Sequence, residues 1–225
     1  MNFWGFCTEF FQLIPCCGFW QRFTDKQEML MREKLLKMTL AVGVVFIVVT
    51  AVFSFYFYEN SQDAQSALAL YMPNVEAVTG KDGTLSLLSL FRSNLFACAT
   101  CVGIGFIPFI FLPAWALLSN AMMIGALLGI VQSSGAVSLT KTIIFGLLPH
   151  GIFELPAFFL SMAMGIYLCK ILTMKIFGKA RDEKILPKLN GIAKGFVMVV
   201  IPLLIVAAVL ECYLTPQLMN LTGIN

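Results

Sequence analysis

The sequence predicts an all-α, polytopic membrane protein. We expect a helix bundle with five transmembrane helices, completed by short interfacial or re-entrant helices. Of its 225 residues, 59% are hydrophobic and only 12% are charged, whereas a soluble domain carries about 25% charged residues. The mean hydropathy is +0.88, which is more apolar surface than a soluble core of this size could hide. Uncharged runs also recur at lengths that match the roughly 30 Å hydrocarbon core of a bilayer.

Residues 1–37 are predicted to form an aromatic, interfacial and basic cytoplasmic segment. The segment has neither the basic start nor the small-residue cleavage site of a signal peptide. Its phenylalanine and tryptophan side chains suit the membrane–water interface. We therefore expect one or two short interfacial helices, interrupted near Pro15 and Gly18. An aromatic cap packed on the other helices is the alternative.

Residues 38–218 are predicted to form the membrane domain, and residues 219–225 a tail. The spans are expected at about 38–58, 91–111, 114–131, 150–172 and 195–213. Residues 38–58 carry no charge. The stretch from Ser93 to Thr140 is also uncharged, but it is too long for one span. Pro108 and Pro113 divide it into a helical hairpin.

A polar segment at residues 59–90 separates the first two spans. Loop signals occur at Pro73-Asn74 and between Gly80 and Gly83. This segment therefore lies outside the membrane and has room for a short surface helix.

The stretch LLPHGIFELPAFFL, residues 147–160, contains the only histidine of the chain. Residues 141–148 are too few to cross a bilayer, and they precede Pro149 and Gly151. Proline and glycine interrupt or bend helices, so Pro149, Gly151 and Pro156 predict a helix break. Residues 141–148 would then form a short or re-entrant element ahead of the fourth span.

The distribution of positive charge predicts the orientation. Five spans place residues 1–37 and the loop between spans four and five on the same side of the membrane. Together with Lys170 at the end of span four, these two regions hold twelve of the fifteen Lys and Arg residues. Because positive loops stay in the cytoplasm, we expect a multi-pass protein of the bacterial cytoplasmic membrane, with a cytoplasmic N-terminus and an external C-terminus.

Polar side chains within the spans are the candidate functional residues. A charge near the bilayer centre costs at least about 2.5–3.5 kcal/mol, so such residues are expected to face protein. His150 and Glu154 are four residues apart and share one helix face. Asn94, Asn120 and Glu211 are the other members of an expected buried polar network or contact site for a partner or substrate.

Several roles for His150 and Glu154 remain open. They could line a substrate path in a transporter or channel, dock the transmembrane helix of a partner, or tie helices together structurally. A proton or metal site is less favoured, because a metal needs three or more ligands and the chain has one histidine and no H-E-x-x-H pattern. No catalytic residue, cofactor or metal ligand is therefore predicted.

Small residues predict close helix packing. Gly125 and Gly129 form a G-x-x-x-G pattern, which lets two helix backbones approach closely. Packing within the chain is the usual meaning, and a homo-oligomer seam is the alternative. Cys98 and Cys101 form a C-x-x-C, but no second pair exists. We interpret them as small apolar residues.

Signatures of soluble catalysis and of nucleic-acid binding are missing from the sequence. It contains no Walker motif, no dinucleotide-binding glycine pattern, no G-x-S-x-G and no kinase signature. The basic loop at residues 173–194 is better explained as a topology signal near anionic headgroups. We therefore predict that the protein is not an enzyme and binds no nucleic acid.

Four stretches resemble the stage II sporulation protein M family of bacterial integral membrane proteins. The most specific is P-H-G-x-x-E-L-P-A, which runs from Pro149 to Ala157. It is supported by FRSNLFACATCVGIGFIP, LLSNAMMIGALLGI and LLIVAAVLECYLTP, which occur in the family's order. The resemblance covers about residues 38–218, and Asn94, Asn120, His150, Glu154 and Glu211 match its polar positions.

The resemblance implies a five-span protein without enzymatic activity of its own. The family's namesake is a scaffold that recruits cell-wall hydrolases, the stage II sporulation proteins D and P, to remodel peptidoglycan during sporulation. Other relatives look like accessory proteins of export or immunity systems. Our lead hypothesis is thus a membrane scaffold or accessory protein with hydrolases or transporter subunits as partners. A small transporter or channel is the alternative.

Overall fold

A computed structural model describes residues 26–73, 78–79, 85–108, 113–135, 137–178 and 185–221. The predicted interfacial helices near Pro15 and Gly18 lie outside these residues. Within them, five helical stretches are long and apolar enough to cross a membrane. The prediction of an all-α, five-span bundle is confirmed.

The five stretches alternate with short connections. The first three are α3 (Lys26–Glu59), α6 (Leu87–Ile104) and α7 (Pro113–Ser134). The fourth joins α8 (Leu139–Lys141), η1 (Thr142–Leu147) and α9 (Leu148–Ile176). The fifth joins α10 (Ile185–Gly195), η2 (Phe196–Val200), α11 (Ile201–Val209), η3 (Leu210–Leu214) and α12 (Thr215–Leu221). A short helix, α4 (Ser61–Ala69), lies in the polar segment after α3.

The π-helical segments η1, η2 and η3 each end two residues before a proline. These prolines are Pro149, Pro202 and Pro216. A proline inside a helix has no N–H and its ring collides with the carbonyl four residues earlier, and each of those carbonyls belongs to the preceding π segment. The wider π turn makes room for the ring, so the helix continues.

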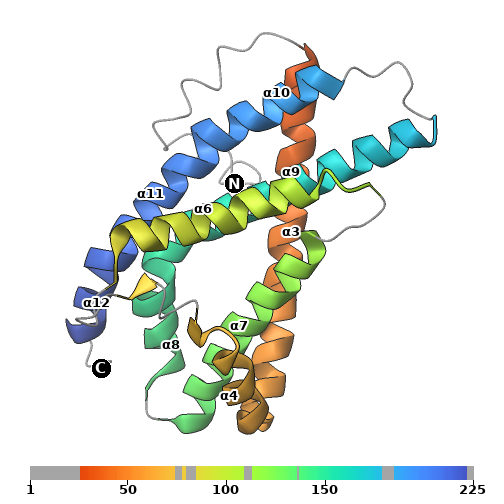
Figure 1. Cartoon of the computed structure of the whole chain (residues 1–225). Helices are drawn as coiled ribbons and strands as arrows, with labels where there is room; N and C mark the ends of the chain where they lie inside the picture. The colour runs from red at the N-terminus through yellow and green to blue at the C-terminus, as the bar shows by residue number, and fades with distance from the viewer. Residues whose placement is uncertain are drawn as a thin grey trace, which may run out of the picture.

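The fourth helix therefore bends but does not end. We expected a break around Pro149, Gly151 and Pro156, whereas the chain stays helical from Leu139 to Ile176. Figure 1 shows that the part labelled α8 and the far part of α9 run in different directions. Proline and π turns are the usual causes of such bends.

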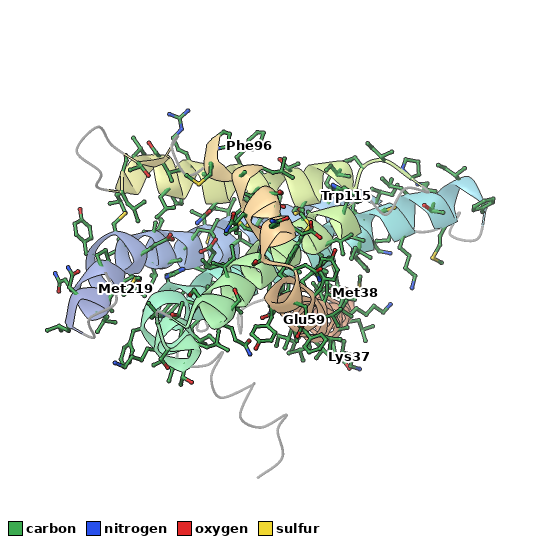
Figure 2. The ribbon with its side chains drawn as sticks, turned by 90° about the horizontal axis from the view of Figure 1, so that it is seen from below. Lys37, Met38, Glu59, Phe96, Trp115 and Met219 are labelled. Carbon is green, nitrogen blue, oxygen red and sulfur yellow. The ribbon has the colours of Figure 1, made fainter. Side chains whose placement is uncertain are left out.

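Helix α9 is the centre of the bundle. It contacts α3, α6, α7 and α11, and nearly all its residues from Ala157 to Ile171 are buried. The outer helices expose apolar residues instead, for example Phe96 at 75% and Trp115 at 69%, and Figure 2 labels Phe96 at the edge of the molecule. This inside-out distribution is what a bilayer requires, because lipid covers the exposed apolar side chains.

Glycines of α7 pack against α3. A Cβ atom at Gly125 would lie 2.5 Å from Cβ of Phe53 and 3.1 Å from the carbonyl oxygen of Thr50. One turn later, a Cβ atom at Gly129 would lie 2.8 Å from Cβ of Phe57. No other residue fits at these positions without moving α3. The G-x-x-x-G pattern thus faces a helix of the same chain.

A second glycine contact joins α6 to α9. A Cβ atom at Gly105 would lie 2.7 Å from Cα of Gly165 and collide with its carbonyl oxygen. The backbones of α6 and α9 meet here with no side chain between them. In a membrane, where apolar burial gives helices little reason to associate, close packing of this kind holds them together.

Candidate functional site

Three ionisable side chains meet between α9 and η3. His150, Glu154 and Glu211 each offer one ligand atom, and these atoms all lie within 4.8 Å of one another. All three side chains are partly buried. Residues from two helices, 57 positions apart between Glu154 and Glu211, therefore form one polar cluster.

The local helix geometry positions each member of this cluster. His150 and Glu154 stand one turn apart in α9 and project from the same face. Glu211 lies inside the π turn η3. Buried Ala207 and Ala208 on α11 belong to the stretch that packs on α9 and leads into η3. Small side chains there let the two helices approach closely.

Thr215 connects the histidine to the first residue of η3. Its hydroxyl donates a hydrogen bond to the carbonyl oxygen of Leu210 at 3.2 Å. The hydroxyl oxygen of Thr215 also lies 3.3 Å from Nδ1 of His150. Because the hydroxyl hydrogen is already used, Nδ1–H is the natural donor in the second bond. The neutral ring then keeps a lone pair on Nε2, free to accept a proton or bind a metal.

The carboxyl groups of Glu154 and Glu211 have no hydrogen-bond partner like the one that Thr215 gives to His150. Among the described residues, neither Glu154 nor Glu211 forms an ion pair or a hydrogen bond through its side chain. An uncompensated carboxylate in apolar surroundings is costly. The cluster can lower that cost by holding protons, by sharing a proton between the two acids, or by binding a cation.

The other predicted polar residues are placed differently. Asn120 donates its side-chain N–H to the carbonyl oxygen of Ala116 at 2.9 Å, within its own helix. Asn94 has a buried side-chain nitrogen with no hydrogen-bond partner. Cys98 and Cys101 are buried free thiols in α6.

Thr215 is the residue that sequence reasoning missed. Its position directly before Pro216, four residues after Glu211, was visible in the sequence. A threonine in the turn that carries an intramembrane acid is a usable signal, because its hydroxyl can bond both a carbonyl of its own helix and a side chain of a neighbouring helix.

The fold and the cluster define a class: a multi-pass helical membrane protein with polar residues gathered inside the bundle. Within that class, the chain matches the family model for stage II sporulation protein M over residues 41–216. It therefore belongs to this family, and the resemblance found in the sequence is confirmed. Proteins of the family are generally not enzymes. Searches of curated proteins and of solved structures found no match.

Proposed function

We propose that this protein is an integral membrane scaffold or accessory protein, which recruits or stabilises partners such as cell-wall hydrolases or transporter subunits. It would act in the bacterial cytoplasmic membrane with its N-terminus in the cytoplasm, and without catalysis of its own. The observation that carries the proposal is membership of the stage II sporulation protein M family over residues 41–216.

The short helix α4 (Ser61–Ala69), which we call the polar platform, follows the first span and supports this role. Helix α4 buries Ala64 and Ala67 against a cluster that includes Phe57 and Ala126. Tyr71 donates a hydrogen bond to the carbonyl oxygen of Ser119 at 2.8 Å. Burial raises the pKa of Tyr71, which keeps the phenol protonated as the donor. The opposite face of α4 exposes polar side chains to solvent.

These exposed side chains give a partner something to bind outside the bilayer. They are Gln62, Asp63, Gln65 and Ser66. If the N-terminus is cytoplasmic, α3 crosses the membrane and α4 lies at the outer face. Cell-wall hydrolases act on that side.

A crosslinking experiment tests the platform. A photoreactive amino acid is placed at Gln65 in the full chain, in the bacterium that makes it. We expect one membrane-associated or cell-wall protein to be captured from Gln65. The control position is Val44, which is 62% exposed on α3 and faces lipid. The same yield of the same protein from both positions, or none from either, would contradict a docking role.

Orientation is tested separately. A reporter enzyme that is active only outside the cytoplasm, fused after residue 225, should be active. The same reporter fused in the loop after Ile176 should be inactive, because that loop is predicted to be cytoplasmic. The reverse pattern would place α4 in the cytoplasm and remove the argument for hydrolase partners.

Transport through the bundle is the second candidate. The gathering of His150, Glu154 and Glu211 inside the bundle supports it, because intramembrane ionisable groups often mark an ion or substrate path. A transporter should produce a solute or proton flux in liposomes that Glu154→Gln abolishes. Absence of any flux, together with partner capture from Gln65, would favour the scaffold.

A further inference from the structure

We propose that His150, Glu154 and Glu211 form a binding site for a divalent transition-metal ion of the zinc type. This inference does not depend on the scaffold role. Neither the family model nor the sequence pattern assigns a metal to these residues.

The donor set fits this class of ion. Zinc accepts histidine nitrogen and glutamate oxygen, and three protein ligands with one open position are typical of exchangeable or reactive zinc sites. An imidazole ligand favours transition metals over magnesium or calcium, which bind oxygen. His150 and Glu154, one turn apart in α9, and Glu211 from the last helix supply one nitrogen and two carboxylates.

Charge provides the second argument. Glu154 and Glu211 together carry up to two negative charges, and the described residues place no cation against them. A divalent cation would cancel both charges at once. Inside a membrane protein, where isolated charge is costly, such neutralisation is a large driving force for binding.

The orientation of the histidine provides the third argument. Metal-binding histidines usually donate their second ring N–H to a nearby acceptor, which fixes the ring and the tautomer. Thr215 is such an acceptor at 3.3 Å from Nδ1 of His150. The Thr215 hydroxyl donates its hydrogen to the carbonyl oxygen of Leu210. Nε2 of His150 is therefore left as the metal-binding nitrogen.

The spacing requires only side-chain rotation. Zinc–ligand bonds of about 2.0–2.2 Å would bring the three atoms closer together than the 4.8 Å within which they lie. Both glutamates have flexible side chains, and the backbone of α9 and η3 can stay in place. The C-terminal end of the fifth span, labelled α12 in Figure 1, packs on η1 at the start of the fourth span. This contact holds the fourth and fifth spans together.

A metal-binding assay on the full chain tests the proposal. The protein is purified in detergent, stripped with a chelator, loaded with Zn²⁺ and desalted, and bound zinc is counted by mass spectrometry. We expect about one zinc ion per chain, as for a mononuclear site. Glu154→Gln and Glu211→Gln should each weaken zinc binding more than tenfold. The controls are Glu33→Gln, which removes an exposed carboxylate, and Ser161→Ala, which removes a buried hydroxyl from α9. Both controls should bind zinc as the unaltered chain does.

X-ray absorption of the zinc-loaded, unaltered chain gives a readout that does not depend on how the variants fold. The proposal requires one imidazole and oxygen ligands around zinc, and no sulfur. Zinc bound equally by the unaltered chain and both glutamine variants would overturn it, as would a zinc spectrum without imidazole. Failure of the stripped, folded chain to bind zinc would also overturn it.

Discussion

The contact between α3 and α7 and the contact between α9 and η3 hold helices together in opposite ways. At the first, Gly125 and Gly129 bring two backbones together because neither glycine has a side chain. At the second, His150, Glu154 and Glu211 bring polar atoms together in an apolar setting. The first contact depends on the absence of side chains and the second on their chemistry. Filling space should break the first, whereas removing single atoms should be enough to alter the second.

The largest effect is expected at the glycine contact. Gly125→Leu would drive a branched side chain into Phe53 and the backbone of α3, and we expect a loss of about 3 kcal/mol in unfolding free energy, since overpacked interfaces cannot relax cheaply. Thermal or denaturant unfolding in detergent measures it.

Gly103→Leu is the matched control for this change. A Cβ atom at Gly103 meets nothing within 4 Å, so the same substitution should change stability by less than about 0.5 kcal/mol. Equal destabilisation by the two leucines would mean that glycine content, and not the α3–α7 contact, sets stability.

The polar contact should respond to a single hydroxyl. Thr215→Val keeps the shape but leaves Nδ1 of His150 without its partner, while the Leu210 carbonyl still accepts the backbone N–H of residue 215. We expect a loss of about 1–2 kcal/mol, the usual cost of unsatisfied buried groups. Thr39→Val is the control, because that hydroxyl bonds only the Leu35 carbonyl of its own helix. If Thr215→Val is no worse than Thr39→Val, the threonine does not hold the histidine.

A smaller effect is expected from straightening η3. Pro216→Ala restores an N–H to the helix and removes the reason for the π turn, so Glu211 and Thr215 should shift relative to α9. Zinc affinity should then fall about tenfold, as for other changes that disturb ligand orientation, while the chain stays folded. Pro187→Ala changes a proline in the first turn of α10, where no π turn precedes it, and should leave zinc affinity unchanged. Similar affinities for the two alanine variants would show that the π turn is not needed for the site.

The smallest effect is expected outside both contacts. Glu33 and Lys37 form an ion pair of 2.6 Å with both side chains largely exposed. Exposed pairs of this kind contribute little because water and salt screen them. Glu33→Gln should therefore give no measurable change in melting temperature, and a clear change would mean that the Glu33 carboxylate makes an interaction beyond its pair with Lys37.

Comparison of these contacts explains what could be predicted from the sequence. The five spans follow from uncharged runs, and the glycine spacing lies within one helix, so both are local properties. His150, Glu154 and Glu211 were each found as polar residues in apolar stretches. Their meeting was not predictable, because Glu211 lies on another helix and the register between α9 and α11 depends on tertiary packing. Gly105 and Gly165 were likewise visible as small residues, but not as a pair.

The π turns have a consequence for how this chain can change in length. Each one accommodates a residue more than regular α winding needs. Deleting one residue from η2 together with the change Pro202→Ala should therefore restore an ordinary helix and leave Glu211 on its present side. The same deletion inside α11 would swing every later side chain by about 100° around the axis. The fifth span thus contains an extra residue at η2. Shortened forms of the protein should lose residues at η2 before they lose them in α11.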